Sequence, residues 1–344
     1  MVKVRKRGEQ IRQFILENLN DHREDIASFT AEKFKITRQA VYKHINLLIS
    51  QGAITATGST KDKIYSLNTK EQINKKYDLK ESPLEEDVVW REDIYPIFEQ
   101  YPENVINIWH YCFTEMFNNV IDHSNGSGVI VRINKTAINT EIVVYDNGIG
   151  IFHKIQKELN LLDERHAILE LSKGKVTTDP QNHTGEGIFF TSRMMDDFTI
   201  LSGATYYNHS KKDEDSDWIF ERTIFKNGTG VFMTLSNNTS KTSKKIFDKF
   251  TATNDDYGFN KTIVPVNLVR YGDESLVSRS QAKRLLARVD RFKIVILDFE
   301  GINSIGQAFA DEIFRVFRSK NRDTEIHHIN ANRDVEDMIV RALI

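Results

Sequence analysis

Three short stretches decide the fold of the central part of this chain: EMFNNVIDHS (residues 115–124), YDNGIGIF (145–152) and HTGEGIFFTSRMMD (183–196). In the first, apolar residues recur at helical spacing, and Glu115 and Asn119 fall one turn apart on the same face. The second closes a strand with an aspartate and two glycines, and the third is a glycine turn that opens a helix. A carboxylate, a metal-ligating amide and backbone that can approach phosphate together indicate a nucleotide site.

Each motif alone has an ordinary explanation. Polar residues at helical steps are also expected on a solvent-facing stripe, DNG is a common turn, and GEG is a weak signal. The combination is more specific, because the flanking pattern places the motifs on a helix, at a strand end and at a second helix start. The helix is expected over residues 98–123, with strands at 128–134, 140–147 and 228–235.

A long charged segment separates the second motif from the third. Residues 152–182 contain LSKGKVTTDPQN (171–182), and an excursion of this length between a strand and a glycine turn is typical of a lid or binding loop. Lys173 and Lys175 are candidate phosphate contacts within it. The ordinary alternative is a solvated loop that happens to carry lysines.

In order and spacing, ExxxN, DNGIGI and a GxG turn at a helix start resemble the GHKL ATP-binding superfamily, which covers gyrase B, Hsp90, MutL and the catalytic domains of histidine kinases. We assign residues 95–240 to this domain. The pattern is most similar to the serine-kinase anti-sigma-factor branch, because GEGIFFTSRMMD (185–196) fits its third motif. The resemblance implies an α/β sandwich that binds ATP and Mg²⁺.

The same resemblance implies roles for individual residues. Glu115 would polarise water or a substrate hydroxyl, Asn119 would ligate Mg²⁺, and Asp146 would bind the adenine amine. Thr229 would assist Asp146 through water. The remaining ATP-binding positions are Gly148 and Gly150 at the base, Gly185 and Gly187 where amides reach the phosphates, and Lys175.

Two departures from the family's pattern bear on the chemistry. The third motif has GEG where many kinases have a longer glycine series, and Glu186 brings a negative charge beside a triphosphate. No helical hairpin with a phosphoacceptor histidine precedes residue 95, which argues against a histidine kinase. The fate of the γ-phosphate stays open.

Residues 1–68 carry 12 Lys/Arg against 7 Asp/Glu, although the whole chain has a formal charge of −2. This asymmetry favours an anionic partner for the N-terminus. Helical patterns at 8–20 and 30–34, a third helix capped by Thr37 and a hairpin resemble a winged helix-turn-helix, whose third helix enters the DNA major groove. A small protein-docking module is the alternative. The candidate DNA contacts are Arg38, Gln39, Lys43 and, in the wing, Lys61.

Residues 69–94 are charged, lack clear β periodicity and are interpreted as a linker with a helical connection. Residues 255–344 then alternate strands and helices in a small α/β layer. FKIVILDFEGINSIGQAFADEIF (292–314) resembles the STAS fold of anti-sigma-factor antagonists, and closely the STAS-like domains attached to GHKL modules. The antagonists carry a phosphorylatable serine at the start of this helix, where this chain has Gln307 or Ala308. A regulatory phosphoserine in cis is therefore not expected.

Composition restricts the class of protein. The chain has 344 residues, 40% hydrophobic and 28% charged, as in soluble proteins of two or three domains. Cys112 is the only cysteine, which excludes an intramolecular disulfide and is expected to be a buried thiol. No apolar run approaches the length of a membrane span, so a cytoplasmic protein without a membrane partner is expected.

The sequence therefore predicts a mixed α/β and α+β multidomain chain with a winged helix, a GHKL sandwich and a STAS-like domain. Its expected function is ATP-dependent regulation, with DNA bound by the winged helix and a protein partner, or the chain's own ATP domain, bound by the STAS-like domain. An enzyme that hydrolyses ATP is the leading interpretation. A serine/threonine kinase of anti-sigma type and a nucleotide sensor without turnover are the alternatives, and an ATP-dependent homodimer is a further expectation.

Overall fold

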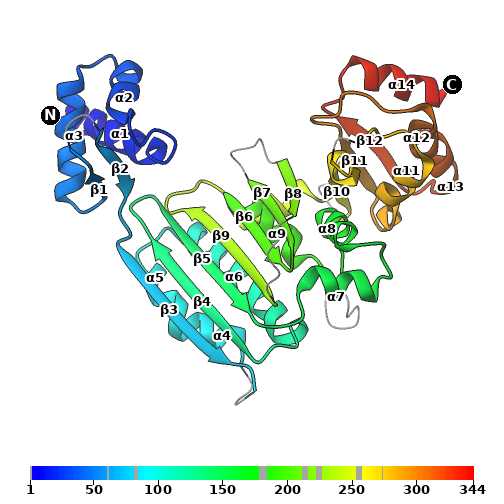
Figure 1. Cartoon of the computed structure of the whole chain (residues 1–344), viewed down its shortest axis with the longest axis horizontal. Helices are drawn as coiled ribbons and strands as arrows, with labels where there is room; N and C mark the ends of the chain where they lie inside the picture. Colours follow the sequence, from blue (N-terminus) through cyan, green and yellow to red (C-terminus); the bar gives the residue numbers. More distant parts are fainter. Residues whose placement is uncertain are drawn as a thin grey trace. The chain divides into compact units, whose positions relative to one another are not determined.

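The structure is a computed structural model that describes residues 2–59, 62–80, 84–177, 184–210, 216–221, 227–252, 258–272 and 274–344. The chain divides into two compact units, and Figure 1 labels its helices and strands in chain order. The first comprises residues 1–75, 131–143 and 234–239, and the second comprises residues 76–130, 144–233 and 240–344.

The N-terminal part of the first unit consists of α1 (Val2–Asn18), α2 (Ile26–Phe34), α3 (Arg38–Ser50) and an antiparallel hairpin of β1 (Ile54–Thr57) and β2 (Ile64–Leu67). This confirms the predicted order of three helices and a hairpin, although α2 begins earlier than predicted. Thr37 caps α3 as expected, since its side chain accepts a hydrogen bond from the Ala40 amide at 3.2 Å. The helices enclose a small apolar core that includes Ile11, Ile15, Leu19, Ile26, Val41, Ile45, Leu48 and Tyr65.

Seven strands form one sheet in the order β3-β4-β5-β9-β6-β7-β8. Their bounds are β3 Glu71–Asp78, β4 Gly128–Lys135, β5 Asn139–Asp146, β6 Asp197–Ser202, β7 Thr205–Ser210, β8 Ser216–Glu221 and β9 Thr229–Ser236. The predicted strands of the central domain are confirmed. β6 pairs antiparallel with β7, and β7 with β8.

β3 corrects the interpretation of residues 69–94 as a linker with only helical structure. Its sequence, EQINKKYD, is mostly exposed and lacks an apolar face. It forms an edge strand, where lysines discourage pairing with other chains. The helical part of the prediction holds, because α4 (Glu86–Val89), a π-helical turn (Trp90–Ile94) and α5 (Tyr95–Phe98) follow.

α6 (Glu103–His123) is the long central helix, and its apolar stripe is buried. It packs against α9 (Gly187–Met194) and α10 (Ser243–Lys249). Residues 152–182, predicted as a lid or loop, instead contain most of α7 (Ile151–Glu158) and all of α8 (Glu164–Lys173). Asp163 caps α8 by accepting a hydrogen bond from the His166 amide at 3.0 Å. Among the described residues of this range, the turn at 159–163 between the two helices and residues 174–177 after α8 are not helical.

The C-terminal segment contains a parallel sheet with β11 (Ile294–Asp298) between β10 (Lys261–Pro265) and β12 (Glu325–Ile329). Its helices are α11 (Arg279–Leu286), α12 (Gln307–Asp311), α13 (Arg318–Lys320) and α14 (Arg333–Leu343), with 3-10 turns at Val266–Val269 and Val289–Arg291 and a π-helical stretch at Glu312–Phe317. Ser278 and Gln281 form a capping box at the start of α11. The predicted alternation of strands and helices is confirmed.

Across the described part of the chain, no helix has the length and apolar character that crossing a membrane requires.

Candidate ligand-binding site

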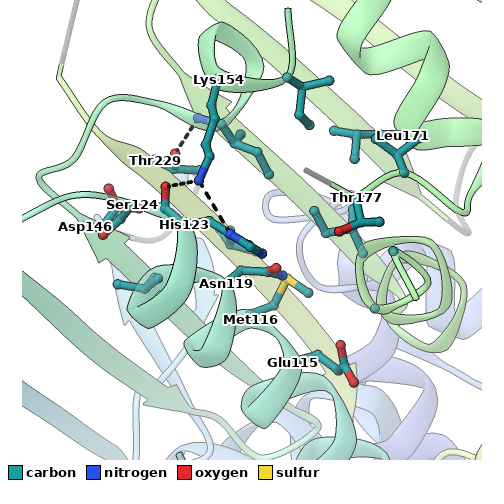
Figure 2. A pocket seen from close by; sticks show the side chains of 18 of the residues that line it. Glu115, Met116, Asn119, His123, Ser124, Asp146, Lys154, Leu171, Thr177 and Thr229 are labelled. Atoms are coloured by element: carbon teal, nitrogen blue, oxygen red, sulfur yellow. Dashed lines mark hydrogen bonds between the residues drawn. The ribbon is translucent and has the colours of Figure 1, made fainter. Parts of the chain in front are cut away.

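A cavity of about 250 Å³ in the second unit gathers residues from all three sequence motifs (Figure 2). α6 and the end of β5 contribute one side, and α7, the end of α8, the turn before α9 and β9 contribute the rest. The described lining residues are Glu115, Met116, Asn119, Val120, His123, Ser124, Asp146, Gly150, Ile151, Lys154, Ile155, Leu171, Val176, Thr177, Thr184, Gly185, Glu186, Gly187, Ile188, Thr229 and Val231.

α6 sets three polar side chains along the cavity. Glu115, Asn119 and His123 follow one another at intervals of four residues, so they lie on one stripe at successive turns. Figure 2 shows their side chains in this order along the helix. All three are half-buried. The predicted pairing of Glu115 and Asn119 on one helix face is therefore present at the cavity wall.

Figure 2 shows Asp146, the last residue of β5, on the opposite side of the cavity from Glu115. Asp146 is 3% exposed, and its carboxylate accepts a hydrogen bond from the Gly148 amide at 2.7 Å. Burial raises the pKa of Asp146, while backbone hydrogen bonds from Gly148 and Thr229 act in the opposite direction. A buried acceptor held by backbone amides is suited to recognising a donor group of a ligand.

Thr229 opens β9 beside Asp146 and connects that strand to α7. Its hydroxyl oxygen accepts a hydrogen bond from the Ile151 amide at 3.0 Å. Gly150, the residue before α7, has a φ of +87°, and a Cβ there would lie 2.7 Å from the Ser202 hydroxyl. Glycine at this position therefore allows the turn after β5 to approach Ser202 at the end of β6.

Gly187 is the first residue of α9, and it is in contact with Glu115. A Cβ at Gly187 would lie 2.0 Å from Oε2 of Glu115. The absence of a side chain at this position thus makes room for the carboxylate beside the start of α9. Gly185, which has a φ of +73°, also lines the cavity.

Two predicted ATP-binding residues lie elsewhere than expected. Gly148 is not among the described lining residues, and a Cβ on it would lie 2.0 Å from the Ser124 carbonyl oxygen, so the protein's own backbone requires this glycine. Lys175 is also outside the lining. Its ammonium donates to the Arg291 carbonyl at 3.2 Å and lies 4.8 Å from the centre of the Phe292 ring.

The structure adds Lys154, which the sequence interpretation did not select. Its ammonium lies 3.2 Å from the His123 carbonyl oxygen and 3.5 Å from Nδ1 of His123 (Figure 2). The local signal was its position four residues after Gly150, in the first turn of a helix. That signal was missed because the segment was interpreted as a lid.

The charges around the cavity are mostly negative. Glu115, Asp146 and Glu186 face one lysine, Lys154, among the described lining residues. Burial raises the pKa of Glu186, and the nearby charge of Lys175 partly opposes this. No cluster of three or more His, Cys, Asp or Glu residues in the described ranges could hold a metal ion.

Three of the four predicted DNA-contacting residues are on α3. Arg38, Gln39 and Lys43 are exposed there, together with Tyr42 and Asn46. Lys61 lies outside the described residues.

Comparison with protein families matches residues 281–336 to the STAS-like domain of unknown function (DUF4325). The match agrees with the parallel sheet and its surrounding helices. This segment is a STAS-like domain. The comparison with curated proteins returned no match for the chain.

The STAS-like domain and the residues that lead into it contact both ends of α8, the helix whose Leu171 lines the cavity. At the N-terminal end, the Tyr271 hydroxyl donates to the carboxylate of Asp163, the α8 cap. At the other end, the Lys173 ammonium donates to the carbonyls of Arg284 at 3.1 Å and Ala287 at 2.9 Å.

The chain that leaves α8 is held in the same way. The Thr262 hydroxyl donates to the Lys173 carbonyl at 2.7 Å, and Arg291 donates to the Lys175 carbonyl at 3.0 Å. A Cβ on Gly174 would lie 2.5 Å from the Phe259 ring. Val176 and Thr177, the next residues, line the cavity. α8 and the residues that follow it thus contact both the cavity and the C-terminal segment that contains the STAS-like domain.

Proposed function

We propose that the cavity binds Mg-ATP and that the protein is an ATP-dependent regulator. The observation that carries this proposal is the placement of a buried carboxylate, Asp146, at one end of a cavity whose other end holds Glu115 and the start of α9. A nucleotide that spans the cavity would place its base and its terminal phosphate in chemically different surroundings.

Asp146 supplies the acceptor that the exocyclic amine of adenine requires, and Thr229 lies next to it. Asn119 lies one turn from Glu115 and offers an amide oxygen, a ligand type that Mg²⁺ accepts together with phosphate oxygens. Bound Mg²⁺ would supply charge neutralisation. The excess of carboxylates over lysines at the described cavity wall supports this need, because a triphosphate adds further negative charge.

Glu115 is the group we assign to turnover. Its carboxylate lies beside Gly187 at the end of the cavity away from Asp146, where it can accept a proton from water during hydrolysis. The same base could accept a proton from a protein hydroxyl, which keeps a serine/threonine kinase as the second function. Release of free phosphate from radiolabelled ATP supports hydrolysis, whereas labelled protein supports the kinase.

The STAS-like domain does not offer the serine that a substrate in cis would need at the start of α12. Gly306 is the cap residue there and Gln307 the first helical residue, while Ser304 lies before the helix and is exposed. We therefore assign this domain to regulation, through its contacts with α8 or through a partner protein. A kinase substrate, if one exists, would be another protein.

DNA binding by the first unit is part of the proposal. The exposed residues of α3 and the excess of Lys/Arg in residues 1–68 support it. Dimerisation upon ATP binding would present two such helices to neighbouring half-sites. Sedimentation velocity with and without Mg-ATP tests the dimer, and an unchanged monomer under saturating ATP would contradict it.

Calorimetric titration of the full chain tests ATP binding. We expect ATP to bind with Mg²⁺, and GTP to bind less tightly because its 6-oxo group cannot donate to Asp146. Asp146→Asn should weaken ATP binding, while Asp248→Asn, at an exposed position on α10, serves as the matched control. A wild-type chain that binds neither nucleotide would refute the proposal.

A further inference from the structure

Lys154 combines three features that suit it to binding an anion. It is the one Lys or Arg of the described cavity wall, it belongs to the first turn of α7, and its ammonium is held by the last residue of α6. The contacts are 3.2 Å to the His123 carbonyl oxygen and 3.5 Å to His123 Nδ1. A carbonyl at a helix C-terminus is a favourable partner for a cation.

These contacts leave donor capacity for a ligand. An ammonium group has three N–H donors, and two of them suffice for the two His123 atoms. In Figure 2 the Lys154 side chain extends toward the side of the cavity where Asn119 and His123 lie. A remaining donor can therefore serve an anion within the cavity.

The stripe on α6 gives the position of Lys154 along the cavity. Each residue of an α-helix advances about 1.5 Å, so His123, eight residues after Glu115, lies about 12 Å from it along the helix axis. Figure 2 shows Asp146 and Ser124 together on the opposite side of the cavity from Glu115. Lys154 thus lies between the Asp146 end and Asn119, and is distant from Glu115.

We propose that Lys154 binds the α-phosphate of the nucleotide, an inference that rests on the proposed function of the cavity. A nucleotide with its base at Asp146 and its terminal phosphate near Glu115 brings its first phosphate to the level of His123. Lys154 then provides the cation that Lys175 was expected to provide. Because every adenine nucleotide has an α-phosphate, Lys154 contributes to ATP and ADP binding alike and takes no part in γ-phosphate transfer.

The test compares ATP, ADP, AMP and adenosine binding to the full chain, by calorimetry for the tighter ligands and ligand-observed NMR for the weaker ones. Wild-type protein should bind AMP more tightly than adenosine. Lys154→Gln should weaken ATP, ADP and AMP binding by about 10- to 100-fold, the range expected for one charge-assisted hydrogen bond, and leave adenosine binding unchanged. Lys157→Gln, at an exposed position on the same helix, is the matched control.

Lys154→Arg keeps a cation and should restore much of the affinity, which guards against a merely misfolded Gln variant. Three results would overturn the inference: a loss confined to ATP, an equal loss for adenosine, or AMP binding no tighter than adenosine in the wild type. Failure of the proposed function looks different, because the wild-type chain would then bind none of the four ligands.

Discussion

Lys173 and Glu170 form an ion pair within α8 that is almost completely removed from solvent, with 2.7 Å between Nζ and Oε1 and side chains 2% and 4% exposed. Arg288 lies 3.4 Å from the other Glu170 oxygen. Burial lowers the pKa of Lys173, and the charge of Glu170 opposes this shift. The pair lies where α8 meets the STAS-like domain. Its loss should therefore lower the stability of the fold and disturb the cavity wall to which α8 contributes.

Lys173→Met should therefore destabilise the protein strongly. Removal of one partner leaves the Glu170 carboxylate buried with less compensation, at a cost of about 3–5 kcal/mol. Urea unfolding of the full chain measures the loss. The double variant Lys173→Met with Glu170→Leu should recover a large part of it, and a double variant as unstable as the sum of both single changes would contradict the coupling.

Asp146 should make ATP binding sensitive to acid. Burial raises its pKa above the ordinary aspartate value of 3.8, so the carboxylate becomes protonated at a higher pH than a solvated aspartate. Above that pKa the charged acceptor is present, and as the pH falls through it the acceptor is lost. As the pH is lowered, ATP affinity should accordingly begin to decline at a higher pH than it would with an aspartate of ordinary pKa. Asp146→Asn should bind weakly at every pH, and a variant that retains the wild-type pH profile would exclude Asp146 as the titrating group.

Glu115→Gln should separate binding from turnover. The amide keeps nearly the same shape beside Gly187 but cannot accept a proton, so ATP affinity should change little while hydrolysis falls by about 10²- to 10⁴-fold. Phosphate release under saturating Mg-ATP measures the effect. Wild-type turnover in this variant would remove Glu115 from the role of base.

Gly187→Ala should displace the Glu115 carboxylate without changing its chemistry. The new Cβ would lie 2.0 Å from Oε2 of Glu115, so the Glu115 side chain must move. Because the end of a side chain can move more readily than backbone, we expect kcat to fall much more than thermal stability. In a Glu115→Ala background the substitution should have little further effect on turnover, and an undiminished additional loss there would point to a different cause.

Arg38→Ala and Lys43→Ala should weaken DNA binding and reduce its dependence on salt concentration, if these side chains contact phosphates. Fluorescence anisotropy with mixed genomic fragments at several salt concentrations is the measurement. Lys320→Ala, an exposed position on α13, is the control. Wild-type protein without salt-sensitive binding would count against a DNA-binding role for the first unit.

Asn119→Ala should abolish the Mg²⁺ dependence of ATP binding, because the variant lacks the amide oxygen that we propose as a ligand of Mg²⁺. Titrations with Mg²⁺ and with EDTA provide the comparison. Retention of the full Mg²⁺ effect would assign the metal to other ligands.

Local patterns in the sequence determined much of the fold. Thr37 could be identified as a cap, and α6, β5 and β9 could be located, because capping and hydrophobic periodicity depend on residues close in the chain. The C-terminal α/β segment was also recognisable from its alternating strands and helices, and residues 281–336 match the STAS-like family. The pattern on α6 likewise placed Glu115 and Asn119 on one face.

Only the tertiary structure decided the rest. β3 forms from a charged stretch because β4 provides its hydrogen-bond partners, and the composition of β3 alone does not predict a strand. Lys175 turns toward Arg291, and Lys154 enters the cavity instead, since the position of each ammonium depends on carbonyl groups distant in sequence. Gly187 is glycine because of Glu115, 72 positions earlier in the chain. Contacts between residues distant in sequence depend on how the whole chain packs, so they cannot be inferred from short-range periodicity.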